Sequence, residues 1–138
     1  MMEEIIISDD KSKLDVELIH KFLSTSYWAA GRSIDEVTKS IDNSICFGIY
    51  KNDAQIGFAR IITDFVVFAY LMDVFILEEH RGNGYSKLLL DRIFDDERFK
   101  GIKKWMLATK DAHSLYNQFG FERVQRPERL MEKVAPGK

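Results

Sequence analysis

Hydrophobic positions in the first third of the chain predict one strand followed by two helices. Residues 3–7 form a short, mostly apolar run that is typical of a strand. Between residues 14 and 23, apolar side chains recur at helical spacing. A second helix is predicted to begin at Ser33, because Ser33 and Glu36 form the pattern in which each side chain accepts the other residue's backbone N–H.

The middle of the chain predicts three consecutive strands. Residues 45–50 and 55–62 are two strand-like runs joined by a polar turn, which is typical of a hairpin. Residues 65–77 are almost continuously apolar and continue the chain as a third strand. Because so few positions in this run are polar, both of its faces are expected to be covered. We therefore place it at the centre of a sheet with helices on both sides.

The last third of the chain returns to alternating helices and strands. After Gly82 and Gly84 the apolar spacing is helical up to residue 96. The segments expected beyond it are a strand at residues 105–108, a helix at residues 112–119, and a final strand or hairpin at residues 121–133 that bends at Pro127. The resulting order, β-α-α-β-β-β-α-β-α-β, predicts an α+β domain with a mixed sheet.

Composition and charge narrow the class of protein. The chain has 138 residues, a length typical of one domain, so we expect residues 1–138 to fold as a single unit. Its 20 Lys and Arg against 22 Asp and Glu give a charge of -2, without the basic stripe of a nucleic-acid-binding protein. No apolar run approaches the ~20 residues of a membrane-spanning helix. Neither nucleic acid nor a membrane is therefore expected as a partner.

Cysteine and histidine usage adds three further expectations. The single Cys46 cannot form an internal disulfide, and the first residues lack the positive charge of a signal peptide, so we expect a cytoplasmic protein. Cys46 lies in an apolar run and is expected to be a small buried residue. No Cys-x-x-Cys or His-Glu-x-x-His pattern is present, so no metal is expected.

Residues 76–86 join the buried central strand to a helix through glycines. Glycines let the backbone approach a ligand closely, and free N–H groups at a helix start favour an anion. A pyrophosphate would fit this loop. The segment is not a Walker A loop and lacks the third glycine of the dinucleotide fingerprint, so nucleotide hydrolysis and hydride transfer are disfavoured. The alternative is a plain turn between strand and helix.

Two motifs resemble those of the GNAT N-acetyltransferase superfamily. The first is Arg81-Gly82-Asn83-Gly84-Tyr85-Ser86, which is similar to the family's acyl-CoA loop, Gln/Arg-x-x-Gly-x-Gly/Ala. The second, at residues 112–121, is similar to the family's helix that ends in Leu-Tyr-x-x-x-Gly-Phe. The resemblance implies a GNAT-like α+β fold, in which a central mixed, mostly antiparallel sheet is flanked by about four helices.

The resemblance also implies acetyl-CoA as cofactor and the residues that contact it. Backbone groups of the central strand would pair with the pantetheine arm if the sheet splays open near Ile76 and Trp105, and the loop would wrap the pyrophosphate. The implied contacts are Val74, Phe75, Ile76, Arg81, Gly82, Asn83, Gly84, Tyr85, Ser86 and Thr109. Two of them depart from the family pattern: Ser86 stands where Gly or Ala is usual, and Thr109 where an Asn is frequent.

The implied reaction is attack of a neutral amine on the acetyl thioester. A backbone N–H of residues 74–76 would stabilise the oxyanion. Tyr116 matches the family's catalytic tyrosine, and a phenol is protonated near neutral pH and can supply a proton to the leaving thiolate. The alternative is that Tyr116 only packs against its own helix.

The amine must also lose a proton, and Asp73 is the candidate acceptor. An aspartate inside an apolar run is costly unless it is paired or lies in a cleft. The alternative is an ion pair with an arginine such as Arg60. Strand alternation places Asp73 on the face of Leu71 and Phe75, opposite Tyr70, unless a bulge reverses the register. Tyr70 is a secondary candidate for lining the acceptor side.

The acceptor site is expected at residues 27–32, because this segment borders the acyl end of the cleft in the family. Tyr27 or Trp28 would suit a flat or cationic group, and Arg32 a carboxylate or phosphate. The alternative is that Trp28 fills core and Arg32 is solvated.

The expected function is acetyl transfer to a small-molecule amine. Protein lysine or N-terminal acetylation and a non-catalytic acyl-CoA-binding or interaction module are the alternatives, and a homodimer is compatible with so small a domain.

Overall fold

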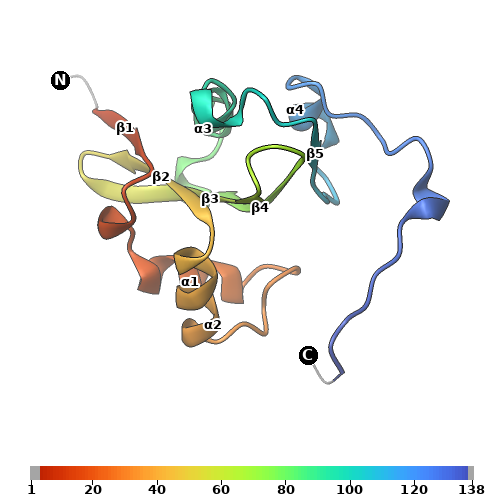
Figure 1. Cartoon of the computed structure of the whole chain (residues 1–138). Helices are drawn as coiled ribbons and strands as arrows, with labels where there is room; N and C mark the ends of the chain where they lie inside the picture. The colour runs from red at the N-terminus through yellow and green to blue at the C-terminus, as the bar shows by residue number, and fades with distance from the viewer. Residues whose placement is uncertain (1–3, 137–138) are drawn as a thin grey trace. The chain divides into compact units, whose positions relative to one another are not determined.

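The structure is a computed structural model that describes residues 4–136 (Figure 1). The chain divides into two compact units, one up to Ala108 and one from Thr109 onward. The first unit contains the whole sheet and three helices, and the second contains one short helix and the C-terminal segment.

A five-stranded sheet forms the centre of the first unit, with its strands in sequence order. Adjacent strands are antiparallel from the first to the fourth, and the fourth and fifth are parallel. The strands are β1 (Ile5–Ser8), β2 (Ile45–Lys51), β3 (Ala54–Thr63), β4 (Phe68–Ile76) and β5 (Lys104–Met106). The predicted class, α+β with a mixed and mostly antiparallel sheet, is confirmed.

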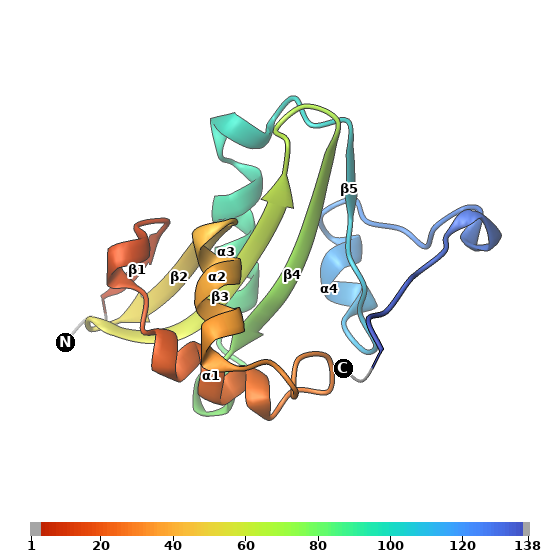
Figure 2. The same cartoon turned by 60° about the horizontal axis from the view of Figure 1, so that its bottom comes forward.

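Three helices cover the two faces of this sheet (Figure 2). On one face α1 (Val16–Ser24) and α2 (Ile34–Asp42) bury an apolar cluster against Phe58 and Phe75. On the other face α3 (Tyr85–Phe94) contributes Leu89, Leu90 and Ile93, all fully buried. Helices on both faces explain why the β4 sequence is so apolar.

Local sequence signals set several of these boundaries. The Ser33 and Glu36 capping box is present, and Asp15 caps α1 by accepting the Leu18 N–H. The predicted hairpin between β2 and β3 turns through Asn52 and Asp53, which both have positive φ, as a tight two-residue turn requires.

The central strand begins later than its apolar sequence predicts. Residues 65–67 form a turn, because the Asp64 carboxylate accepts the backbone N–H groups of Val66, Val67 and Phe68. Phe65 adopts a φ of 67° in this turn. A single polar side chain therefore removes three apolar residues from the predicted strand.

The second unit contains α4 (His113–Asn117), which is followed by Gly120 at a φ of 89°. The predicted final strand or hairpin at residues 121–133 is wrong, since this segment contains only the 3-10 turn Pro127–Arg129. Residues 122–136 are exposed and largely charged or polar, so they lack an apolar face to bury against a sheet. Pro127 also removes a backbone donor from the segment.

A substitution at Gly57 on β3 would test how tightly the sheet is packed. A Cβ at this position would lie 2.6 Å from Ile76 Cδ1 and 2.7 Å from the Phe75 carbonyl oxygen. We expect Gly57→Ala to lower the free energy of unfolding by about 1–3 kcal/mol, measured by urea denaturation. Gly101→Ala is the control, because no heavy atom lies within 4 Å of its Cβ. Equal stabilities of the two variants would contradict this account.

Candidate functional site

The glycine loop between β4 and α3 presents a row of free backbone donors. The amides from Gly82 to Lys87 have no acceptor within residues 4–136, and the first helical bond of α3 is made by the Leu88 N–H. Gly82 and Gly84 have φ values of 82° and 78°, and no heavy atom would lie within 4 Å of a Cβ on either. Consecutive amides at a helix start fit an anionic ligand such as a pyrophosphate.

Side chains around the loop hold it in place. Arg81 donates from Nε to the Ile76 carbonyl at 3.0 Å, and its guanidinium lies 5.9 Å from the centre of the Phe22 ring. Asn83 donates from Nδ2 to the His80 carbonyl at 3.1 Å. Tyr85 is buried among the core residues, so its backbone rather than its ring is available to a ligand. The loop is therefore preorganised by contacts that leave its amides open.

The edge of β4 next to this loop is open. β5 pairs with β4 only from Phe68 to Tyr70, and the described residues provide no partner on that side for residues 71–76 (Figure 2). The two strands diverge from that point, as the expected splay requires. Phe75 stacks on Phe22 in the core, with ring centres 4.0 Å apart, so only its backbone can serve an extended ligand. This edge suits an amide-bearing arm that adds as an extra strand.

A bulge interrupts β4 at Asp73. Phe58 pairs with Phe75 and Arg60 with Met72, so β4 contains one more residue than β3 across this interval. Asp73 itself has a φ of 57°. The bulge breaks the alternation, so that Arg60 contacts both Asp73 and Met72, which simple alternation predicts on opposite faces. The predicted placement of Met72 opposite Asp73 is therefore wrong.

The Asp73 carboxylate is the centre of a buried polar cluster. Its Oδ1 accepts the Trp28 indole N–H at 2.9 Å. Its Oδ2 accepts Arg32 at 2.7 Å and Arg60 at 2.9 Å. Arg60 also donates to Ser44 Oγ at 3.0 Å. The ion pair with Arg60, weighed as an alternative to the role as base, is thus present, and both oxygens of Asp73 are occupied.

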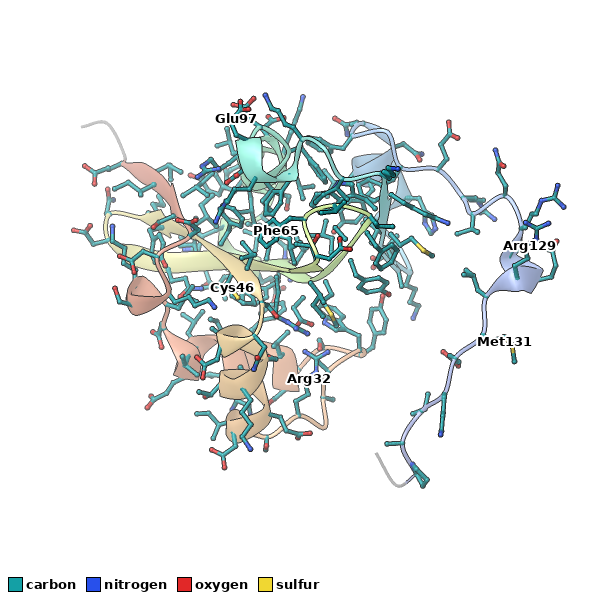
Figure 3. All side chains as sticks on the ribbon, in the orientation of Figure 1. Arg32, Cys46, Phe65, Glu97, Arg129 and Met131 are labelled. Atoms are coloured by element: carbon teal, nitrogen blue, oxygen red, sulfur yellow. The ribbon has the colours of Figure 1, made fainter. Side chains whose placement is uncertain are left out.

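The expected acceptor segment meets this cluster. Trp28 is 39% exposed although its N–H is tied to Asp73, and Arg32 points from the α1–α2 connection toward the sheet (Figure 3). Neither residue is purely core or purely solvated. Tyr27 is largely exposed and packs edge-on against Trp28. Tyr70 is half-buried on β4, two positions before Met72. Sequence reasoning did not identify Ser44 and Met72 as partners of Arg60, because neither residue type signals such a contact.

In the second unit, two predicted site residues have local contacts. Thr109 Oγ1 accepts the Ala112 N–H at 3.1 Å next to the start of α4. The Tyr116 carbonyl accepts the Phe121 N–H at 3.2 Å, and the two rings pack edge to face. These contacts fix the backbone around Tyr116 through the Gly-Phe ending of the motif.

Cys46 lies close to the Asp73 cluster, because it pairs with Arg60 across β2 and β3. Cys46 is buried as predicted, and burial raises the pKa of its thiol to about 11, so it is not a nucleophile near neutral pH. Within residues 4–136, His, Cys, Asp and Glu side chains form no group that could hold a metal ion. The described part of the chain also contains no helix of the length and hydropathy needed to span a bilayer.

The central role of Asp73 can be tested by neutralising it. Asp73→Asn would leave Arg32 and Arg60 without a counter-charge, and breaking a buried pair in this way costs about 3–5 kcal/mol. We expect that loss of unfolding free energy in urea denaturation. Asp91→Asn on the exposed side of α3 is the control, and its stability should stay within about 0.5 kcal/mol of the parent. A small effect at Asp73 would mean that the cluster does not stabilise the fold.

Comparisons with known proteins agree with this geometry. The family model described as an acetyltransferase (GNAT) domain matches residues 42–123, which span both units of the chain. A provisionally assigned acetyltransferase of Gibberella zeae is 30% identical, with 83% of this chain and 77% of that protein covered.

Solved structures extend the comparison to the fold. A provisionally assigned GNAT acetyltransferase of Xanthomonas campestris pv. campestris superposes with a TM-score of 0.92 at 44% identity, over 97% of this chain and 95% of the other. An acetyltransferase from Clostridium acetobutylicum, assigned by prediction and crystallised with acetyl-CoA, shares the fold with a TM-score of 0.68 at 18% identity, over 96% of each chain. The chain therefore belongs to the GNAT family of acetyltransferases.

Proposed function

We propose that this acetyltransferase transfers the acetyl group of acetyl-CoA to the primary amine of a small molecule. The observation that carries the proposal is the row of six unbonded amides, Gly82 to Lys87, beside the open edge of β4. Both features are made of backbone and fit a ligand in which an extended, amide-bearing arm is followed by a pyrophosphate. The acceptor would bind at residues 27–32, next to the Asp73 cluster.

The proposed cofactor contacts divide between strand and loop. Bound acetyl-CoA supplies a thioester whose acyl carbon is open to attack by an amine. Backbone groups of Val74, Phe75 and Ile76 would hold the amide-bearing arm along the open edge. Amides of the loop, from Gly82 through Ser86, would bind the phosphates, with Arg81 and Asn83 keeping the loop in shape. Thr109 is proposed as a further contact from the second unit.

The oxyanion that forms during the reaction needs a hydrogen-bond donor, and the leaving thiolate needs a proton donor. We assign the donor to a backbone N–H in the Val74–Ile76 region, which follows the bulge at Asp73. Tyr116 is the proposed acid for the leaving thiolate, because it stands in the matched Leu-Tyr-x-x-x-Gly-Phe motif and a phenol is protonated at neutral pH.

The proton of the attacking amine needs another acceptor. Asp73 already accepts three hydrogen bonds, so taking this proton would disrupt an ion pair with Arg32 or Arg60. We therefore propose that Asp73 positions the acceptor segment and that the proton leaves to water, with Tyr70 lining the acceptor side.

Ligand-dependent stability tests the cofactor site. A ligand that binds only the native state at about 100 times its Kd adds about 2.7 kcal/mol, enough to raise Tm by roughly 5 °C or more. We expect this shift with acetyl-CoA and CoA, and no shift with ATP, by differential scanning fluorimetry. Gly84→Ala should abolish it, because a side chain at this φ strains the loop. Gly101→Ala should retain it, and an unshifted parent protein would refute the proposed site.

Replacement of Tyr116 tests the catalytic role. We expect Tyr116→Phe to lower kcat about tenfold or more, with the acetyl-CoA thermal shift unchanged, because only the proton donor is removed. Activity is followed as free thiol released with a panel of amines and lysine peptides. Tyr50→Phe is the matched control, since the buried Tyr50 hydroxyl has no hydrogen-bond partner among the described residues. Equal turnover of the two variants would exclude Tyr116 as the acid.

A further inference from the structure

The cluster around Asp73 holds unequal numbers of positive and negative charges. Arg32 and Arg60 both donate to Asp73, so two guanidinium groups share one buried carboxylate. The acidic residues next along the chain from Arg32 are Asp35 and Glu36, and both are exposed to solvent. Glu36 also accepts the Ser33 N–H in the capping box. A partly buried charge of about +1 is therefore left beside the β4 bulge, and such charges are normally paired.

Arg60 cannot be the residue that binds an additional anion. Its Nε donates to Asp73 at 2.9 Å, one terminal nitrogen donates to Ser44 Oγ at 3.0 Å, and the other contacts Met72 Sδ at 3.0 Å. All three nitrogens are occupied, and the residue is only 6% exposed.

Arg32, in contrast to Arg60, keeps donors unused by the described residues and is partly exposed. Only one terminal nitrogen is used, in the 2.7 Å contact with Asp73, and the side chain is 24% exposed. No acceptor for its Nε or second terminal nitrogen is present within residues 4–136. The bond to Asp73 fixes the guanidinium plane, so the remaining donors are preorganised at the surface of the cluster.

The indole of Trp28 lies beside this guanidinium. Trp28 donates to Oδ1 of the same carboxylate whose Oδ2 accepts Arg32, so both side chains are held within one carboxylate of each other. Trp28 remains 39% exposed and offers an apolar surface next to the free donors. This pairing suits an anion attached to a short aliphatic chain.

We propose that the acceptor is an amino carboxylate, and that Arg32 binds its carboxylate group while Trp28 contacts its aliphatic part. The inference deepens the proposed function and rests on it. A carboxylate carries one charge and matches the excess of about +1, whereas a phosphate monoester carries about -1.5 to -2 at neutral pH and would exceed it. The carboxylate also matches the two-donor geometry of the guanidinium.

Matched pairs of amines test this substrate class. Glycine, β-alanine, 4-aminobutyrate and 6-aminohexanoate are compared with their primary amides as acceptors, with rates expressed per unprotonated amine. We expect kcat/KM to be about tenfold or more higher for the carboxylate in at least one pair, as for a charge-assisted hydrogen bond. Equal rates within every pair would overturn the proposal.

Variants of Arg32 test the residue. Arg32→Gln should lower kcat/KM more for each amino carboxylate than for its amide, mainly through KM, and so remove the preference for the carboxylate. Arg32→Lys keeps the charge but loses the two-donor geometry, so it should fold like the parent and retain a reduced preference. Arg92→Gln is the matched control, because Arg92 also donates to an aspartate, Asp96, at 3.0 Å and packs on Phe47. An unchanged preference in Arg32→Gln would overturn the assignment.

A binding measurement separates this inference from the proposed reaction. The Tm of the CoA-bound protein is measured with 4-aminobutyrate, 6-aminohexanoate and their amides. Stabilisation by an amino carboxylate alone, lost in Arg32→Gln and kept in Arg92→Gln, supports the inference even if no amine is acetylated, an outcome that would refute the proposed reaction. If no amino carboxylate stabilises the protein and no carboxylate preference is found, the inference is refuted. Acetylation of the amides in that case would still support the proposed reaction.

Discussion

The need to compensate one buried carboxylate organises the first unit. Asp73 lies on β4, and its partners come from β3 and from the connection between α1 and α2. Leaving any partner out would expose a buried charge to a low-dielectric interior, so the three segments are held together by electrostatics as well as by apolar packing. The connection at residues 27–32, which would otherwise be an ordinary surface loop, is thereby fixed to the middle of the sheet.

The proposed site assigns different tasks to backbone and side chains. Cofactor recognition would depend on amides of the glycine loop and of the β4 edge, which many sequences could supply so long as glycine is kept where φ is positive. Acceptor recognition would depend on individual side chains held by Asp73. This proposed division would let the fold keep its cofactor while its acceptor varies, because the two sets of residues lie on different segments.

Much of the fold could be predicted because its signals are local. The Ser33 capping box, the Asn52 and Asp53 turn and the glycine loop each depend on a few neighbouring residues. The Asp73 cluster could not be derived in the same way, since Trp28 and Asp73 are 45 positions apart and a bulge decides which face Asp73 occupies. The false final strand arose because scattered apolar residues near Val124 and Leu130 suggest alternation without showing whether a partner strand exists.

The strand order has a consequence for the order of folding. β2, β3 and β4 are joined by short connections, so their pairings close short loops and are expected to form early, whereas the β1–β2 pairing spans α1 and α2. Pairing of β5 has to wait until α3 has been traversed, and it then covers only three residues of β4. All partners of Asp73 precede that point in the sequence. During synthesis from the N-terminus, the segments that carry Asp73 and its three partners therefore leave the ribosome before the segment that carries Tyr116, the proposed proton donor.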